Sequence, residues 1–556
     1  MPDNCTAASR AVVAVVARTV RHQNSGLTIG TRPDCRGTRQ ANGCILNGIR
    51  ISHPPADGLG RAGNIQTHMV KLRKWIASFS NGPLWERSGG VVALLTALAL
   101  FAWLVYLIRG GLASWFDGDD LMNLFFSLDR PWPALLKANL MFWSSYYRPA
   151  GGLFYRVIYD VWGFHPLPFH IAAFAFLLVD FWLLAVIVRR LTGSRWCVLV
   201  SLLLVGIHGC WNGAYFETPA IYDILAYAFF WSAFWCYLRV RQAGRIPGWR
   251  DLTLPLCSFV AALNAKEISV GLPVAVGLYE LVWHPPSDWK PAALLRWVWN
   301  EGRFAGIGAL MDLIYIIGKT FGSESLLRYW PYQPHFSVKT YLESSAHFLG
   351  ELLYGRVQIT PWQMGALLAG MLLVAAVTRR RCLLWATGFV SVSVFPIAFI
   401  PMRSGFSYLV PSVGWAVYAS GFLELLVDLF ARQRRLLRSV TQVLIFAALF
   451  RLAAPWHGLS TRMGKQAAHN AQDVYRGYNG EIHALIGTPR KGARFLLLSD
   501  APAHNGWDIC FLIRLSYGDR STVIDRKTVL DEQHKKVDPN RYDYVLDWKN
   551  GHFERR

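Results

Sequence analysis

Eleven apolar segments divide the chain, and they constrain its fold more than any other feature. They lie at residues 90–109, 166–188, 195–209, 220–238, 252–264, 268–284, 304–321, 362–378, 382–401, 408–430 and 438–455. A helix needs about 20 apolar residues to cross the hydrocarbon core of a bilayer, so the shorter segments need their flanks or a tilt. We therefore expect an α-helical multi-pass membrane protein with about eleven transmembrane helices.

The composition agrees with this class. Only 17% of the 556 residues are charged and 53% are hydrophobic, whereas a soluble domain carries about 25% charged residues. A formal net charge of +22 could indicate a nucleic-acid partner. The Lys and Arg residues, however, lie in short clusters between apolar segments, so we expect a lipid bilayer and no nucleic acid as the partner.

The basic clusters occupy every second loop. They comprise Lys71, Arg73 and Lys74; Arg189, Arg190 and Arg195; Arg239, Arg241, Arg245 and Arg250; Arg379, Arg380 and Arg381; and Arg432, Arg434, Arg435 and Arg438. Because Lys-rich and Arg-rich loops face the cytoplasm, this alternation predicts a cytoplasmic N-terminus in the inner (plasma) membrane. The alternate loops and the tail are then extracytoplasmic. One of them, residues 322–361, contains the run Val338–Leu353, which predicts an amphipathic interfacial helix.

Composition also divides the chain into three predicted regions. Residues 1–68 hold few carboxylates and show no periodicity, so we expect a disordered basic extension, with Met69 as an alternative start. Residues 69–456 form the predicted transmembrane catalytic domain. In residues 457–556 the predicted strands are Arg494–Ser499, Ser521–Asp525 and Tyr542–Leu546, and the predicted helix is Asp508–Tyr517. This alternation favours a small extracytoplasmic α/β domain with an accessory role.

Ionisable residues gather at the ends of segments on the predicted outer side. They are Asp119, Asp120, Arg148, Asp223, Lys266, Glu267 and Arg403. Charges at the membrane rim are costly and mark functional sites by default, so we expect these side chains to converge on one outer cavity. The richest stretch is the loop Ser114–His170, which follows the first segment.

Each of these residues also has a structural interpretation. The aspartate cluster could be a solvated loop or a calcium site. Lys266 and Glu267 could pair with each other at a helix end, and Arg148 could cap a helix or contact lipid headgroups. Asp223, at the predicted start of a helix, could be an N-cap.

Four motifs resemble those of a known family. They are Phe116–Asp120 (Phe-Asp-Gly-Asp-Asp) with Tyr147–Pro149 and Gly163–His170; His208 followed by Asp223–Ala226; Ala265–Glu267 (Ala-Lys-Glu); and Arg403 with Ser407–Gly414. In their order they are similar to the GT-C superfamily of membrane glycosyltransferases, closest to its protein O-mannosyltransferase branch, which includes transmembrane TPR-containing enzymes. The resemblance covers about residues 90–430.

The resemblance implies that a hexose-type sugar moves from a polyprenyl-phosphate donor to a hydroxyl acceptor on a protein, lipid or glycan. Supporting residues carried over from the motifs are Glu267, Asp223, His208, Tyr408 and His170. The chain departs from the family at Gly213, near a family glutamate, and at Ala172, Ala173 and Asp180, where the family has Asn and His. The tail shows no TPR period, so neither the sugar nor the acceptor carries over.

A phosphate leaving group determines what such a site needs. Phosphate departs without a general acid, so one carboxylate is enough to take the proton from the attacking hydroxyl. Asp119 or Asp120 suits this role, and the family pattern favours Asp119. Cations must stabilise the departing phosphate. Arg403 suits that role because its planar fork binds phosphate oxygens bidentately, with Lys266 and Arg148 as further candidates. A single displacement predicts inversion at the anomeric carbon.

Other interpretations stay open at this point. No spacing of ligands predicts a metal site or cofactor, although a divalent cation held through Asp120 or His208 is an alternative. His165, His170 and His208 are expected to be structural more often than ligands. A transporter or flippase of lipid-linked sugars would show internal repeats and broken helix pairs. A scaffolding protein would not need these charges on one rim.

Overall fold

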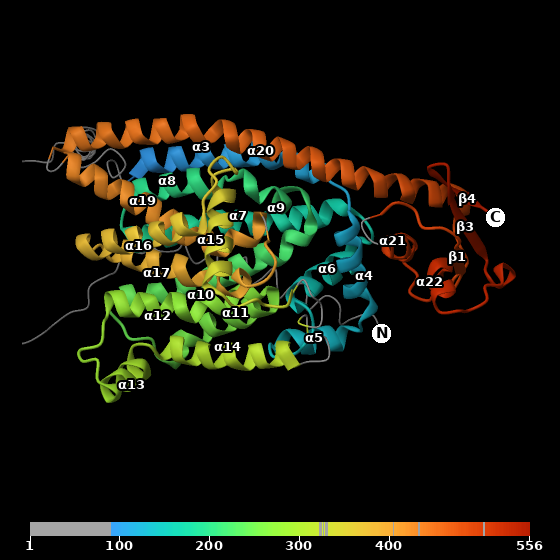
Figure 1. The fold of residues 1–556 in the computed structure, drawn as a ribbon, viewed down its shortest axis with the longest axis horizontal. Coiled ribbons are helices and arrows are strands. Elements are labelled where there is room, and N and C mark those ends of the chain that lie inside the picture. Colours follow the sequence, from blue (N-terminus) through green and yellow to red (C-terminus); the bar gives the residue numbers. More distant parts are fainter. Residues whose placement is uncertain are drawn as a thin grey trace, which may run out of the picture. The chain divides into compact units, whose positions relative to one another are not determined.

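The computed structural model describes residues 90–321, 325, 327, 332–403, 405–431, 434–503 and 506–556. The predicted extension 1–68, the alternative start Met69 and the basic residues Lys71, Arg73, Lys74 and Arg432 lie outside the described residues. Each of the eleven apolar segments coincides with helical structure. The chain is therefore an α-helical multi-pass membrane protein, as its apolar pattern predicts (Figure 1).

Eight helices of the described residues are long and apolar enough to cross a membrane. They are α3 with η2 (Val91–Ala113), α7 (Pro166–Thr192), η5 with α10 (Thr218–Gln242), α14 (Arg303–Phe321), α16 (Pro361–Thr378), α17 with α18 (Arg381–Ala398), η9 with α19 (Gly405–Ala431) and α20 (Arg435–Ile486). A ninth span results if α8 with η3 (Arg195–Gly206) and η4 with α9 (Gly209–Phe216), which meet at a 47° bend, count as one.

Two of the eleven predicted spans form a shorter, broken pair of helices. Residues 252–264 lie in α11 (Trp249–Ala265), and residues 268–284 lie in η6 (Glu267–Gly271) and α12 (Leu272–Trp283). Lys266 separates them with an extended backbone, φ −160° and ψ 151°. Neither helix reaches about 20 residues, so the prediction of eleven full spans is not met by length.

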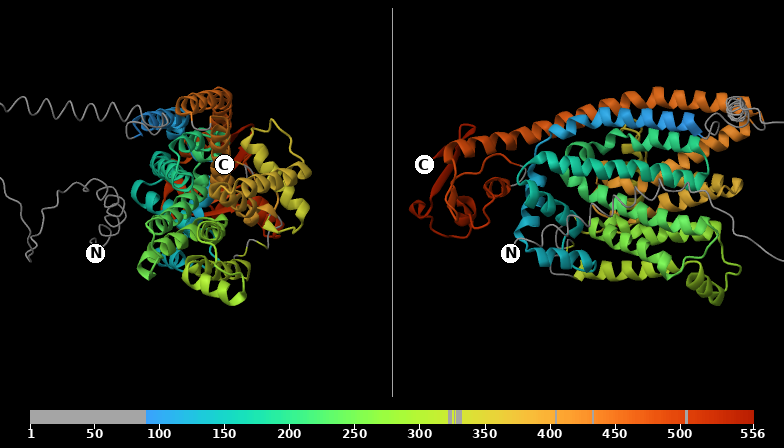
Figure 2. Two further views of the ribbon diagram at one scale, coloured as in Figure 1. Left: turned by 90° about the vertical axis from the view of Figure 1, so that its left-hand side faces the viewer. Right: turned by 180° about the vertical axis from the view of Figure 1, so that it is seen from behind.

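The loop between the first two spans folds into three helices. They are α4 (Gly118–Asp129), α5 (Trp132–Leu140) and α6 (Pro149–Trp162). The helices α4 and α6 pack against each other, and α4 also contacts α21 (Asp508–Tyr517) of the tail. They lie at the end of the bundle nearest the C-terminal sheet, which Figure 2 shows from two further sides. The predicted amphipathic run also forms a helix, α15 (Val338–Leu352).

The helix α20 changes the predicted domain boundary. It has 52 residues and continues through Pro455 to Ile486, so a boundary at residue 457 falls inside one helix. At about 1.5 Å per residue, α20 is about 78 Å long, more than twice the thickness of the hydrocarbon core. It runs beside α3 and reaches β4 of the tail (Figure 1).

The tail forms the predicted small α/β domain. Its four-stranded sheet has the order β2-β1-β3-β4, with β1 (Arg494–Leu497) parallel to both β2 (Val523–Arg526) and β3 (Tyr544–Lys549). The strand β4 (His552–Arg555) runs antiparallel to β3 and was not predicted, nor was α22 (Lys527–Glu532). The three predicted strands and the predicted helix are confirmed.

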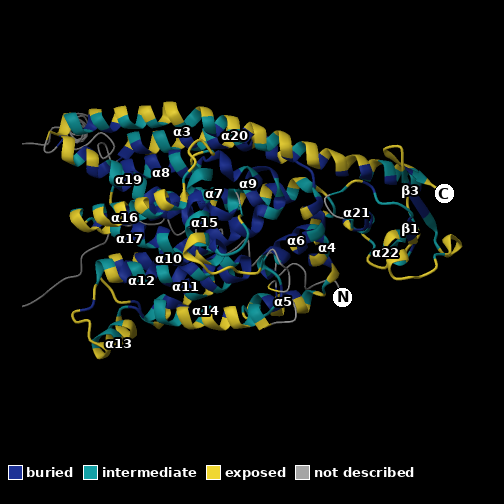
Figure 3. Cartoon of the chain, in the orientation of Figure 1, coloured by how far each residue is buried: buried dark blue, intermediate teal, exposed yellow. Residues whose placement is uncertain are grey.

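Burial in the bundle follows the membrane pattern. Large apolar side chains on the outer faces of α16 and α20, such as Leu373 and Leu452, are exposed, as expected where lipid replaces water. Figure 3 shows the buried residues on the inner faces of the same helices. The interior contains stacked aromatic rings, including Trp385 on Phe389 with centroids 5.0 Å apart.

One buried ion pair ties together three helical elements at the predicted cytoplasmic end. Arg241 Nε and Nη2 donate to Glu280 at 2.8 and 2.7 Å, and Tyr237 also donates to Glu280 at 2.8 Å. Glu301 accepts from Arg241 at 2.5 Å. The Glu280 side chain is fully buried, and its other partner, His284 Nδ1 at 3.1 Å, belongs to the end of the same helix, so its charge depends mainly on Arg241.

We expect Glu280→Ala to destabilise the bundle strongly, because it leaves Arg241 buried without its main counter-charge; loss of one partner of a buried pair costs about 3–5 kcal/mol. The measurement is the thermal unfolding midpoint of the purified protein in detergent. Arg245→Ala is the control, since its pair with Asp251 is long, 3.5 Å, and Arg245 is 62% exposed. An unchanged midpoint in Glu280→Ala would contradict the assignment.

Candidate active site

The stretch before α4 is held by aromatic packing and by the long helix α20. Phe116 is fully buried and stacks on Phe164 with centroids 4.7 Å apart. The Trp115 backbone N–H donates to Gln472 Oε1 at 3.0 Å, and Gln472 Nε2 donates to the Phe216 carbonyl at 2.8 Å. Gln472 therefore joins the start of the aspartate cluster to the segment that precedes α10.

The three aspartates occupy different positions at the start of α4. Asp117 is the N-cap and accepts from the Asp120 backbone N–H at 2.9 Å, while Asp120 Oδ2 accepts from the Asp117 N–H at 3.0 Å. This reciprocal pair is a capping box. Thr218 donates to the other oxygen of Asp120, which is fully buried. Asp119, between them, is exposed in the first turn.

Burial and mutual repulsion raise the pKa values of two of these carboxyls and of a nearby glutamate. Burial, together with the charge of Asp119, raises the pKa of Asp117 to about 6. Burial and the charge of Asp117 raise the pKa of Asp120 well above its usual value. Burial, with Asp117 and Asp119, raises the pKa of Glu217 to about 7. Glu217 therefore faces the same cluster.

A second group of charges forms two ion pairs. Lys266 Nζ donates to both oxygens of Asp223 at 2.5 and 2.6 Å, and Arg148 Nη2 donates to Glu267 at 2.8 Å. Because the backbone at Lys266 is extended, the side chains of Lys266 and Glu267 point to different partners. The interpretation that they pair with each other is therefore wrong. Asp223 is the third residue of α10 and pairs with Lys266, so it is not an N-cap.

Asn123 and Tyr222 connect the aspartates to these pairs. Asn123 Nδ2 donates to the Asp119 carbonyl at 2.8 Å, and the Tyr222 hydroxyl donates to Asn123 Oδ1 at 2.8 Å. The Arg148 guanidinium lies 5.4 Å from the centre of the Tyr222 ring. The Tyr222 ring packs directly against Gly151 of α6. A Cβ at Gly151 would lie 2.0 Å from a Tyr222 ring carbon, so a larger residue would displace the ring.

The segment after α18 approaches from another side. Lys266 Nζ lies 5.8 Å from the centre of the Phe406 ring, and the Tyr408 hydroxyl donates to the Arg403 carbonyl at 2.6 Å. The Arg403 guanidinium lies over Tyr332, 4.8 Å from the ring centre. Arg403 thus belongs to a segment that contacts Lys266 through Phe406.

The predicted supporting histidines have structural surroundings. His208 Nδ1 accepts from the Cys210 N–H at 3.1 Å, and its Nε2 is 2.9 Å from the Leu352 carbonyl. With both ring nitrogens engaged, His208 stacks on Tyr354. His170 is buried in α7. Within the described residues, no group of three or more His, Cys, Asp or Glu side chains is arranged to hold a metal ion.

Several site residues were missed by sequence reasoning. Glu217, Thr218, Asn123, Tyr222 and Gln472 all contact the aspartate cluster or its neighbours. Glu217 could have been found, because it is a carboxylate beside an apolar segment on the predicted outer side. Gln472 could not, since the tail was read as a separate domain.

Comparisons with known proteins assign neither a family nor an activity to the chain. No family model and no curated protein matches the chain. Among solved structures it is similar to the crystal structure of ArnT from Cupriavidus metallidurans in the apo state, with 15% identity and a TM-score of 0.42. The alignment covers 83% of this chain and 93% of that one. A likeness of this strength assigns no activity.

The raised pKa of Glu217 predicts a pH effect on stability. Its folded pKa of about 7 lies above the usual 4.5, so the folded state binds more protons between these values. The free energy of unfolding should therefore fall as pH rises from about 4.5 to 7. In Glu217→Gln this part of the fall should disappear, as measured by unfolding midpoints at pH 5 and 7.5. The control is Glu343→Gln, on the half-exposed Glu343 of α15.

Proposed function

We propose that the chain is a membrane glycosyltransferase of the GT-C type. It moves a hexose-type sugar from a polyprenyl-phosphate donor to a hydroxyl acceptor on the extracytoplasmic side. The observation that carries the proposal is that an exposed carboxylate, Asp119, and the buried cations Arg148 and Lys266 belong to one network, which reaches Asp119 through its backbone carbonyl. Asn123 and Tyr222 link the two groups.

Solvent exposure favours Asp119 over Asp120 as the general base, because Asp120 is fully buried. Both oxygens of Asp120 are occupied, one by the Asp117 backbone and one by Thr218. Removing Asp120 from this arrangement would open the capping box of α4. Asp119 lies exposed in the same turn, where an acceptor hydroxyl can reach it.

The cations suit a phosphate leaving group to different degrees. Lys266 is only 9% exposed and contacts both oxygens of Asp223, so its charge is largely balanced by that carboxylate. Arg148 uses Nε and Nη2 in its pair with Glu267, and Nη1 takes no part in that pair. Arg148 is therefore a better candidate than Lys266 for binding phosphate oxygens, and Arg403 stays a candidate for its planar fork.

The reaction balances with these groups alone. Asp119 accepts the proton of the acceptor hydroxyl, and the oxygen forms a bond to the anomeric carbon of the sugar. The bond from that carbon to the phosphate oxygen breaks, and its electron pair leaves with the phosphate. One displacement inverts the anomeric centre. The arginines stabilise the negative charge that grows on the phosphate.

Glu217 supports the proposal at the point where the chain departs from the family. One of its carboxylate oxygens lies 3.3 Å from the position that a Cβ on Gly213 would take. Glu217, four residues after Gly213, thus places its carboxylate beside the position where the family has a glutamate side chain. The tail packs onto the same helix as the aspartates, through Phe511 stacked on Phe125 at 4.7 Å, which suits an accessory role near the acceptor.

The test is a transfer assay in vesicles with a panel of polyprenyl-phosphate sugars. Asp119→Asn should lower the rate about 10²–10⁴-fold, the usual contribution of a general base, without changing the amount of folded protein. Asp129→Asn, at the other end of α4, is the matched control and should keep full activity. Full activity of Asp119→Asn would remove Asp119 from the mechanism.

The neighbouring variant separates catalysis from capping. Asp120→Asn should lower the free energy of unfolding by about 1 kcal/mol, because it weakens the capping box. Asp119→Asn should not, since its side chain is not part of that box. Movement of labelled donor lipid across the bilayer without sugar transfer would support the transporter alternative instead.

A further inference from the structure

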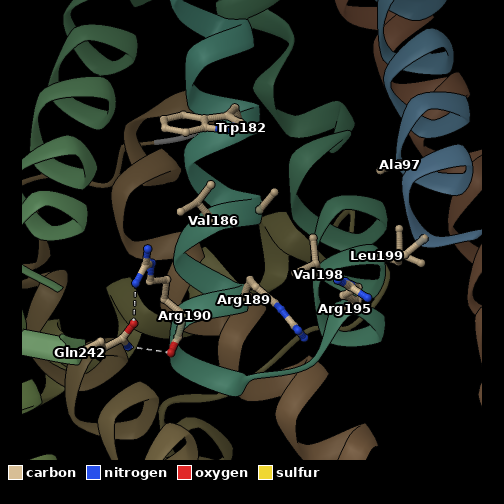
Figure 4. A pocket seen from close by; sticks show the side chains of 11 residues that line it. Ala97, Trp182, Val186, Arg189, Arg190, Arg195, Val198, Leu199 and Gln242 are labelled. Atoms are coloured by element: carbon tan, nitrogen blue, oxygen red, sulfur yellow. Dashed lines mark hydrogen bonds between the residues drawn. The ribbon is translucent and has the colours of Figure 1, made fainter. Parts of the chain in front are cut away.

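A second cluster of charge lies at the other end of α7 from the aspartates. There a cavity of about 590 Å³ opens between α3, α7 and α8, with Gln242 of α10 at its edge (Figure 4). Its polar part is formed by Arg189, Arg190, Arg195 and Gln242, and its apolar part includes Trp182 and Val186. No carboxylate of the described residues lines it.

The length of α7 is consistent with a cavity at the depth of lipid headgroups. From His170, near the aspartates, to Arg190 is 20 residues of continuous helix, about 30 Å at 1.5 Å per residue. This distance equals the thickness of the hydrocarbon core. If the aspartates lie at one surface of the membrane, the three arginines lie at the other, which the basic loops predict to be cytoplasmic.

Two of the arginines are positioned by specific contacts. Arg190 Nη1 donates to Gln242 Oε1 at 3.0 Å, and Gln242 Nε2 donates back to the Arg190 carbonyl at 2.9 Å. The guanidinium of Arg195 lies against Gly90, where a Cβ would be 2.6 Å from the guanidinium carbon. Gly90 is the N-cap of α3, so Arg195 adds its charge to the positive end of a helix dipole.

The apolar part of the cavity continues onto a lipid-facing surface. Figure 4 shows the arginines grouped at one end and Trp182, Val186 and Ala97 further along. Beyond it, Leu94 and Leu95 of α3 are 59% and 60% exposed. A molecule with an anionic head and apolar chains would match both parts at once.

We propose that this cavity binds the phosphate of an anionic glycerophospholipid from the cytoplasmic leaflet. The phosphate lies among Arg189, Arg190 and Arg195, and the acyl chains follow Trp182, Val186 and the exposed face of α3. Basic pockets between transmembrane helices on the cytoplasmic side recognise such headgroups by charge. The site is distinct from the aspartate cluster and does not depend on glycosyl transfer.

The test measures lipid binding by the full-length protein after detergent exchange, by native mass spectrometry. Phosphatidylglycerol should be retained far better than phosphatidylcholine of the same chain length. In the double variant Arg189→Gln with Arg195→Gln, its affinity should fall about 25-fold, since each basic residue contributes about fivefold. The control is Arg381→Gln, an exposed arginine in another basic loop that does not line the cavity.

Three results would overturn the proposal: equal retention of both lipids, equal loss in the control, or binding of inorganic phosphate with no binding of phosphatidylglycerol.

A second, milder variant tests the site in case the double variant does not fold. Gln242→Glu keeps the shape of the side chain that accepts from Arg190 and adds a negative charge at the edge of the cavity. It should weaken phosphatidylglycerol binding while leaving phosphatidylcholine binding unchanged, and unchanged binding of both would also reject the site.

Discussion

The ion pair between Lys266 and Asp223 is the interaction on which the outer half of the structure depends. It joins the first turn of α10 to the break between α11 and η6, and both side chains are almost completely buried. A lone charge at such a depth would cost several kcal/mol, so each group requires the other. Since the pair fixes the extended backbone at Lys266, it also directs Glu267 toward Arg148. The N-terminal end of α6 is thereby held near Tyr222.

The two ends of the bundle differ in the charged side chains that they bring together. At the predicted outer end, two carboxylates pair with Arg148 and Lys266, and burial raises the pKa values of Asp117, Asp120 and Glu217. At the other end, the cavity between α3, α7 and α8 has three arginines and no lining carboxylate among the described residues. Paired cations beside carboxyls suit chemistry on a substrate that brings its own phosphate, whereas a group of arginines beside apolar side chains suits a surface in contact with anionic lipid.

Secondary structure could be predicted from the sequence where it follows from a local pattern of apolar residues. Long apolar segments gave helices, and the strands Arg494–Leu497 and Tyr544–Lys549 follow from short apolar runs bounded by polar residues. The prediction failed where local signals were ambiguous. The last predicted span ends at residue 455, whereas α20 continues through Pro455 to Ile486, because packing along the helix can offset the hydrogen bond and the bend that an interior proline costs. Residues such as Gln472 were missed for the same reason.

The sequence by itself determined that the chain is a membrane protein, where its helices lie and which charges stand at their ends, because bilayer thickness and helix rise leave few alternatives. Only the tertiary structure decided which charge meets which. Lys266 and Glu267 are adjacent in sequence, yet they bind residues 43 and 119 positions away. The same holds for the aspartates. The capping box between Asp117 and Asp120 is local to the start of α4, but the hydrogen bond from Thr218 to Asp120 exists only because α4 packs against η5 (Thr218–Ala220).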